Sequence, residues 1–492
     1  MKMTRMTVLL LSSVLMMTAA AHDGQMTKAP SLVVGVGFNE QYHNRQIALW
    51  SLRQIHANMP LIDDAWSVQL LYGMTSQMNA TVRTQPILAT PLINDTQVNA
   101  FAVTGGVIGI NTGVVLSAGG LDEVASVLAH EIAHLSQRHY EARADNHKKL
   151  LALQLGGLLA ALAASAASGD AALAVMAGSQ TGVAENAAAH SREHEREADR
   201  LGQQILSQSG YDAHAMPRFF HQLYRQVSLN RSANAFAPSF MQSHPFTMER
   251  LSEATARAAR YPAVSMSDKQ NQARLFDLLY WRLKYLTRQT NLVELTANAA
   301  QSQGARLALA MLLTDDGQYN KAQKTLDAGD FAHDEVLFVL VQSDLLTAQH
   351  RYDEASNLLT PLQAIYPERR DLRLYLAKNL IARQQIPQAL ALLQDLTYKS
   401  THDVQAWQLI QQAYETKAQS DTDERSQDIS TIYALQARSQ VELWTAKYEA
   451  ALQSNAQAQK ISQTRDSLMP LTRTFQADKE QIIAARDFKP RF

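Results

Sequence analysis

Two histidines and a glutamate in this sequence have the spacing of a metal site that can carry out acid–base chemistry. His130, Glu131 and His134 occur in the segment "LDEVASVLAHEIAHLSQRHY", whose periodicity predicts one helix beginning near Asp122. Residues four apart on a helix lie about 40° apart around its axis, so the two imidazoles can bind one ion. Neutral imidazole suits zinc, and Glu131 is placed to act as a general base toward water. The alternative is a core helix that carries surface histidines.

A further ligand must come from another segment, because catalytic zinc typically keeps three protein ligands and one open position. The segment "HSREHEREADRLG" (190–202) is the best source of a carboxylate. Glu195 and Asp199 are four apart and share a helix face, whereas Glu193 and Glu197 lie on the opposite face and are expected in solvent. Asp199 is also suited to orient a ligand histidine or to assist proton transfer.

The composition narrows the class of protein. A chain of 492 residues is too long for one ordinary core, and 46% hydrophobic with 18% charged residues indicates folded domains. The formal net charge of -1 gives no reason to expect a nucleic-acid partner. The sequence has no cysteine, which excludes thiolate ligands and thiol proteases and is compatible with an oxidising compartment in which no disulfide is used.

The first 21 residues have the pattern of a cleaved secretory signal peptide. Lys2 and Arg5 form a charged start, and Val8–Met17 is an apolar stretch too short to span a bilayer. Ala19–Ala21 supplies the small residues of a cleavage site. We therefore expect a periplasmic protein.

Residues 22–262 combine helical periodicity with short strand signals, which predicts a small sheet among helices. Val103–Val115 is rich in valine and isoleucine with glycine punctuation, as expected of short strands. The stretch 260–270 contains a proline and a helix cap at Ser267 or Asp268, and we place the domain boundary there.

Residues 263–460 repeat with a period of 33 to 34 residues. The recurring positions are Tyr319, Tyr352 and Ile386; Ala322, Ala355 and Ala389; Leu326, Leu359 and Leu393; and Ala310, Ser343 and Ala377. Small residues in phase where paired helices touch predict an α-helical solenoid of the tetratricopeptide repeat (TPR) type, with a plain helical bundle as the alternative. A degenerate unit with Tyr448 and Ala451 follows a polar insertion at 419–428, and 461–492 is expected to form a helix and a basic tail.

Three segments together resemble a known family. The segments "HEIAH", "SREHEREAD" and "NAFAVTGG" (99–106) are similar to the gluzincins that include the CAAX prenyl protease type 1 and the heat-shock protease HtpX. The second motif of that family, SRxxExxAD, is matched by Ser191, Arg192, Glu195, Ala198 and Asp199. The resemblance implies a mainly α protein with a zincin-like α+β metalloprotease domain, one zinc ion per chain, and Glu195 as the third ligand.

The signal, the repeats and "SHPFTMERL" (243–251) narrow the resemblance to periplasmic members with TPR repeats. In those members the histidine of the HP motif, here His244, can occupy the fourth zinc position and hold the enzyme inactive. The alternatives are a loop histidine before Pro245, or one that assists catalysis.

The resemblance implies a zinc metalloendopeptidase that degrades misassembled outer-membrane proteins and assists their assembly as a chaperone. Its repeats would dock the outer-membrane β-barrel assembly machinery. Val107–Asn111 resembles the family's edge strand and is expected to bind extended substrates by β-augmentation. Because TPR units are expected to pack only against their neighbours, a chain ending near Tyr261 should lose partner docking while its zinc site can still form. The competing hypothesis is a TPR scaffold or chaperone with an inactive protease domain.

An uncharged stretch at 150–169 is long enough to cross a membrane. A single span would place the histidine pair and Glu195 on opposite sides of a hydrocarbon core about 30 Å thick, where they cannot share a metal. We favour an alanine-rich helical excursion across 150–189, positioned to touch a membrane or a partner. An integral-membrane protease is the alternative.

Overall fold

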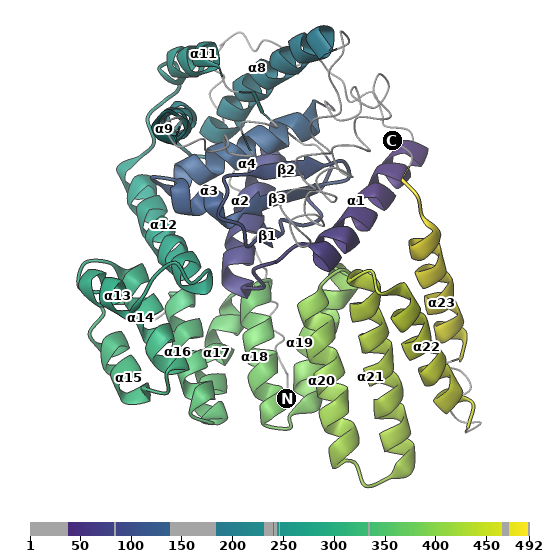
Figure 1. The fold of residues 1–492 in the computed structure, drawn as a ribbon. Coiled ribbons are helices and arrows are strands. Elements are labelled where there is room, and N and C mark those ends of the chain that lie inside the picture. The colour runs from purple at the N-terminus through teal and green to yellow at the C-terminus, as the bar shows by residue number, and fades with distance from the viewer. Residues whose placement is uncertain are drawn as a thin grey trace, which may run out of the picture. The chain divides into compact units, whose positions relative to one another are not determined.

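The computed structural model describes residues 38–82, 85–137, 184–230, 240, 244–245, 247–332, 335–464 and 472–490 (Figure 1). The predicted signal peptide at 1–21 and the stretch 150–183 therefore lie outside the described residues. None of the helices in the described part of the chain is long and apolar enough to span a membrane. The described residues from His43 onward belong to one compact unit.

A three-stranded sheet lies in the first part of the chain. Its strands are β1 (Leu92–Ile93), β2 (Ala100–Val103) and β3 (Val107–Asn111), in the order β1-β3-β2. β3 pairs parallel with β1 and antiparallel with β2. The connection between β2 and β3 turns at Gly105 and Gly106, whose φ angles of 91° and 93° disfavour any residue with a side chain.

The prediction that Val107–Asn111 is an edge strand is wrong, because β3 is the central strand with both neighbours paired. All five of its residues are buried. A Val/Ile-rich run indicates a buried strand, but it does not say which strand ends up between the others. The edge strand antiparallel to β3 is β2, which also contacts helix α4.

Seven helices of the described part belong to the same region of the chain as this sheet. They are α1 (Phe38–Asn58), α2 (Ala65–Val82), α3 (Thr112–Ser117), α4 (Leu121–Ser136), α8 (Ala184–Gln208), α9 (Ala215–Asn230) and α11 (Met248–Ala258). Helix α4 is central: α2, α8, α9, β2 and β3 all pack against it.

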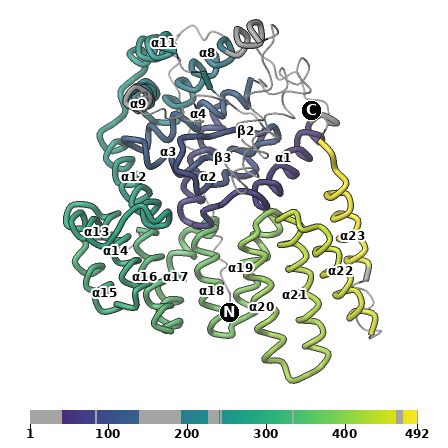
Figure 2. Tube along the Cα trace, in the orientation of Figure 1, coloured from purple at the N-terminus to yellow at the C-terminus, as the bar shows by residue number. Residues whose placement is uncertain are grey.

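The remainder of the described chain is helical and runs as a series of neighbouring helices (Figures 1 and 2). The helices are α12 (Met266–Leu286), α13 (Leu292–Asn298), α14 (Gln303–Asp315), α15 (Tyr319–Asp327), α16 (Val336–Ala348), α17 (Tyr352–Ile365), α18 (Arg370–Ala382), α19 (Ile386–Lys399), α20 (Val404–Ser420), α21 (Glu424–Trp444), α22 (Tyr448–Ser462) and α23 (Thr472–Asp487). The mainly α fold class is confirmed.

The predicted repeat register is confirmed by the helix boundaries. Tyr319, Tyr352, Ile386 and Tyr448 are the first residues of α15, α17, α19 and α22. The alanines and the Ala310/Ser343/Ala377 set are all fully buried where paired helices touch. Small side chains at these positions let the helix backbones approach closely. The period in the sequence therefore corresponds to the repeat of helix pairs along the solenoid.

The turn inside each of these helix pairs also repeats. Gly317, His350, Gln384 and Ala446 all have left-handed φ angles between 55° and 72°, two residues before the next helix. The following N–H bonds back to the carbonyl five residues earlier, as in Gln385 N to Leu380 O at 2.8 Å. Only one of the four positions is glycine, so packing imposes a conformation that the other three residues disfavour.

The N-cap of α12 lies two residues before Ser267 and three before Asp268, the two predicted candidates. Ser265 is the N-cap, and its side chain accepts the Asp268 N–H. The Ser265 hydroxyl in turn donates to the Asp268 carboxylate at 2.6 Å. Asp268 is therefore part of the cap, although Ser265 and not Asp268 is the N-cap residue. The domain boundary at about 262 stays a prediction.

The repeats do not pack only against one another, which corrects the expectation for a chain ending near Tyr261. Helix α12 contacts α3 and α4, and α18 contacts α2. One continuous apolar cluster includes Leu128 of α4, Leu283 of α12 and Leu374 of α18. Arg282 forms a buried ion pair with Asp64, which precedes α2. A shortened chain would therefore expose part of the core around α4.

Candidate active site

Helix α4 holds four ionisable side chains inside the protein, one near its start and three in its last two turns. Its remaining residues are mostly apolar on every side, which buries the helix all around. At its start the Glu123 carboxylate accepts the Gly119 N–H at 2.7 Å. His130, Glu131 and His134 are at most 2% exposed. Burial of such groups is costly unless they meet partners of opposite charge or a metal ion.

Helix α8 brings the carboxylates to α4. Glu195 and Asp199 lie one turn apart, and both are fully buried. Glu193 is exposed and the Glu197 side chain is 37% exposed, so the predicted division of the two helix faces is confirmed.

A glycine sets how closely the two helices approach. A Cβ atom built on Gly202 would lie 3.3 Å from Cα of His130 and 3.1 Å from the Met216 side chain. A larger residue at this position would push α8 away from the first histidine, and the carboxylates would move with the helix.

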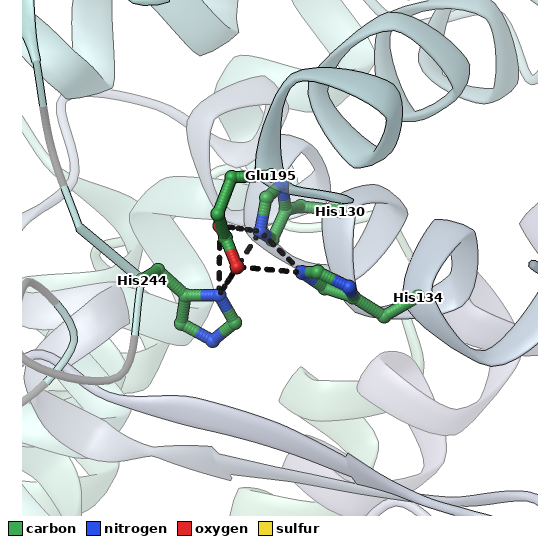
Figure 3. Close-up of side chains that lie close together, drawn as sticks. All are labelled: His130, His134, Glu195 and His244. Carbon is green, nitrogen blue, oxygen red and sulfur yellow. Dashed lines mark hydrogen bonds and ion pairs between the residues drawn. The ribbon is translucent and has the colours of Figure 1, made fainter. Parts of the chain in front are cut away.

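Four side chains converge on one point between α4 and α8 (Figure 3). His130 Nε2 lies 3.0 Å from His134 Nε2 and 3.2 Å from His244 Nδ1. Glu195 Oε2 lies 3.1 Å from His244 Nδ1, and Glu195 Oε1 lies 3.4 Å from His134 Nε2. The sequence predicted each of these residues, and the structure brings all four together in a buried cluster that can hold a metal ion.

Besides the other candidate ligands, His244 contacts two further residues, Glu131 and Phe240. It is 5% exposed, although it lies in a turn. Its Nε2 atom is 3.4 Å from Oε1 of Glu131, and its ring packs against Phe240 with centroids 4.7 Å apart and the ring planes tilted by 31°. In this arrangement the two ring nitrogens of His244 face different groups, Nδ1 the clustered side chains and Nε2 the Glu131 carboxylate.

The charges of the cluster favour a cation. Burial opposes ionisation of Glu195, yet the neighbouring His244 and the hydrogen bond of His130 hold the pKa of that carboxyl well below its usual range. Burial also opposes a charge on His130, but the carboxylates of Asp199 and Glu195 raise the pKa of His130 to about 9 in the ion-free protein. Burial lowers the pKa of His134 far below its usual value. Ionised carboxylates and a neutral His134 form a donor set that suits a divalent metal.

Asp199 lies behind the first histidine. Its Oδ1 is 3.1 Å from His130 Nδ1, the ring nitrogen that faces away from the cluster. A carboxylate at this position fixes the orientation of a ligand imidazole and raises its basicity. The structure therefore places Asp199 within reach of His130, where the predicted orienting role requires it.

Arg250 is a site residue that the sequence reasoning missed. Its guanidinium bonds to both carboxylate oxygens of Asp199, at 2.7 and 2.8 Å, and it is 2% exposed. The pKa of Asp199 is lowered because this arginine outweighs the cost of burial. The residue stands in the segment that contains His244, but nothing in the sequence indicates which carboxylate it meets.

The edge of the sheet beside α4 is formed by β2. Asn111 N donates to Asn99 O at 2.9 Å, so by the alternation of antiparallel pairing Ala100 and Ala102 turn their backbone groups away from β3. Among the described residues, no strand pairs with this edge. Just before β2 begins, the Phe240 N–H donates to the Val98 carbonyl at 3.1 Å.

Comparison with known proteins agrees with this geometry. Residues 74–258 match the model of Peptidase family M48. The matched part of the chain includes β2, β3, α4, α8 and α11. Residues 346–413 match a tetratricopeptide repeat model.

The chain is also similar to curated proteins over most of its length. A β-barrel assembly-enhancing protease of Escherichia coli is 26% identical over 383 residues, which is 75% of this chain and 76% of that protein. A similarly named protein of Vibrio cholerae is 29% identical over 436 residues, 83% of each chain. A β-barrel assembly-enhancing protease of Yersinia pestis is 28% identical over 381 residues, 74% of this chain and 76% of that protein.

Proposed function

We propose that this chain, a metallopeptidase with an M48 peptidase domain and a TPR region, is a periplasmic zinc endopeptidase that degrades misassembled outer-membrane proteins. The observation that carries the catalytic part is the buried cluster of His130, His134, Glu195 and His244, with Glu131 beside it. The relatives' names support the client class, and the signal pattern at 1–21 supports the location.

The four donor atoms fit zinc. A tetrahedral ion with bonds of about 2.0–2.1 Å has ligand atoms about 3.3–3.4 Å apart. The donor atoms of the cluster are separated by 3.0–3.4 Å along the pairs described above. We assign His130, His134 and Glu195 as the ligands of one zinc ion, with Asp199 orienting His130.

Glu131 is the general base of the proposed reaction. Zinc, when bound, supplies a Lewis acid that polarises the water and the scissile carbonyl. Glu131 accepts the proton of the attacking water and passes it to the leaving amine. Its full burial removes competing solvent from the proton transfer.

The edge strand β2 is where we place an extended substrate. Ala100 and Ala102 would offer backbone donors and acceptors beside α4, and backbone pairing gives affinity without strict sequence choice. Such binding suits unfolded chains as clients.

We further propose that the structure represents a resting state in which His244 is the fourth ligand. His244 Nδ1 would take the fourth ligand position of the ion, and its Nε2 faces Glu131, so the position of the water and the base would both be blocked. Release requires movement of the turn that carries His244 and exchange of one ligand.

The partners follow from the second half of the chain. TPR helices commonly present extended binding surfaces, and we propose that they dock the outer-membrane β-barrel assembly machinery and hold unfolded outer-membrane proteins, with a chaperone role. Contact of 150–189 with a membrane surface remains a proposal from the sequence.

The test is casein hydrolysis by the full-length zinc-loaded protein and two variants. Glu131→Gln should retain zinc and hydrolyse casein about 10²–10⁴-fold more slowly, because the general base is gone and the ligands remain. His244→Ala should hydrolyse faster than the parent, with zinc still bound. A large fall in rate for His244→Ala would refute the resting-state role. Absence of hydrolysis in the parent and in His244→Ala would favour the inactive-scaffold hypothesis.

A further inference from the structure

The side chain of Arg250 contacts three parts of the site at once. Nε and Nη2 bond to the two oxygens of Asp199. Nη1 donates to the backbone carbonyl of Pro245 at 2.7 Å and lies 3.3 Å from Oε2 of Glu195. The guanidinium also lies 5.2 Å from the centre of the Phe220 ring. One buried cation therefore joins a ligand carboxylate, the carboxylate behind His130, and the turn that carries His244.

The start of α11 fixes where Arg250 stands. Thr247 is the N-cap of that helix, and its hydroxyl accepts the Arg250 N–H at 3.2 Å. The turn of His244 and Pro245 lies immediately before this cap. The Arg250 main chain is thus tied to the segment that follows the turn, while its side chain reaches back to the Pro245 carbonyl.

We propose that Arg250 is a positioning residue that couples the His244 turn to the metal-ligand shell. This inference depends on the proposed role of His244 as fourth ligand. The guanidinium holds Asp199 with two donors, and Asp199 faces His130. The third nitrogen holds the turn through Pro245. Removal of the planar fork would release the turn and at the same time loosen the orientation of the first histidine.

Lysine cannot replace this arrangement. Its ammonium is a compact point charge, whereas arginine presents donors in a rigid plane that meets both oxygens of a carboxylate. A lysine at position 250 can keep a charge near Asp199, but it cannot also hold the Pro245 carbonyl from the same geometry. The Arg250→Lys exchange therefore keeps a positive charge near Asp199 but removes the link to the turn that carries His244.

Arg257 provides a matched control on the same helix. It lies two turns after Arg250 on α11, and its Nε donates to Gln203 Oε1 of α8 at 2.9 Å. It joins the same pair of helices, but it contacts none of the four clustered side chains in the described contacts. Arg257→Lys should affect packing of α11 on α8 without affecting the metal site.

The experiment uses the full-length protein loaded with Co²⁺ in place of zinc, and it records the visible d–d absorption. His244→Ala exchanges a nitrogen donor for solvent and should shift the spectrum. Arg250→Lys should show the His244→Ala spectrum, and the double variant should show no further change. Arg250→Lys should also bind Co²⁺ about 10-fold more weakly, because the carboxylate behind His130 is less well held. Arg257→Lys should keep both the parent spectrum and the parent affinity.

The outcomes separate the two proposals. If His244→Ala has the parent spectrum, the fourth-ligand role is wrong and the coupling falls with it. If His244→Ala shifts and Arg250→Lys does not, the coupling alone is overturned. Near-UV circular dichroism checks that Arg250→Lys is folded. Should it not fold, Arg250→Gln, which keeps an amide donor for Asp199 but loses the reach to Pro245, is held to the same spectral result.

Discussion

The metal-site region and the repeat region are both helical, but they are held together by different kinds of contact. Between α4 and α8, buried ionisable side chains meet at one place, and each has a specific partner. In the repeats, alanines and leucines recur at equivalent positions and pack by shape. The difference implies that single substitutions should abolish a function in the first region and cause graded losses of stability in the second.

The largest loss of stability is expected where the two regions meet. Arg282→Met leaves the buried carboxylate of Asp64 without its partner, which should cost about 3–5 kcal/mol of unfolding free energy. Denaturant unfolding of the full chain measures it. The double variant Arg282→Met/Asp64→Leu should recover part of the loss, because neither charge of the pair then remains buried, while the Ser67 N–H loses its acceptor. A double variant as unstable as the single one would show that the apolar replacements, rather than the orphaned charge, cause the loss.

The next prediction concerns metal binding and tests the expectation that one substitution between α4 and α8 abolishes a function. Glu195→Gln should weaken zinc binding by about 100-fold or more, since losing even a residue that hydrogen-bonds to a ligand commonly weakens metal binding 10–100-fold. Chelator competition measures the affinity. Glu193→Gln and Glu197→Gln are the controls on the same helix, because both side chains reach solvent. Equal affinity in all three variants would mean that the wrong carboxylate has been assigned.

A pH effect is expected at a histidine outside the metal site. Burial, followed by the charge of His402, lowers the pKa of His56 to about 4. The unfolded chain would take up this proton near pH 6.5. The folded state therefore loses stability as the pH falls from about 6.5 towards 4, by on the order of 2 kcal/mol.

Unfolding at pH 7 and pH 4.5 tests this, with His56→Gln as the comparison. The parent should lose more stability than His56→Gln over this interval. Parallel losses in the two proteins would place the acid sensitivity elsewhere, for example at the buried cluster of His130, His134, Glu195 and His244 that both share.

The repeat half of the comparison predicts a smaller, purely steric effect. Ala355 is fully buried at the start of α17, and Ala355→Leu should cost about 1.5 kcal/mol by overpacking, with unchanged zinc content. Gly202→Ala is the informative counterpart, because its Cβ would crowd His130 and should reduce zinc affinity. Loss of zinc from Ala355→Leu would contradict the division between chemistry and shape.

The smallest effect is expected at the repeated turns. His350 has a φ of 60°, so His350→Gly should relieve strain and, after the added freedom of the unfolded chain, stabilise the protein by about 0.5 kcal/mol. Gly317→Ala, at the equivalent turn, should destabilise it. Thermal unfolding measures both, and opposite signs from those given would show that the turns are not equivalent.

The sequence by itself determined the parts that depend on local spacing. A four-residue interval places His130 and His134 on one helix face wherever the helix lies, and a 34-residue period fixes the repeat register from Tyr319 to Ile386. The likeness of the second motif to a known family singled out Glu195 over Asp199, a choice that helix geometry alone left open.

Only the tertiary structure decided what depends on contacts between distant segments. Strand order made β2 the edge and β3 the centre, because hydrogen-bond partners are chosen across the sheet and not along the chain. The approach of α11 to α8 gave Arg250 its carboxylate, 51 residues away in the sequence. The ion pair of Asp64 with Arg282 spans 218 residues, and it joined two regions that periodicity alone presents as separate. Local periodicity specifies which face of a helix is apolar, whereas the partner of that face depends on how the whole core closes.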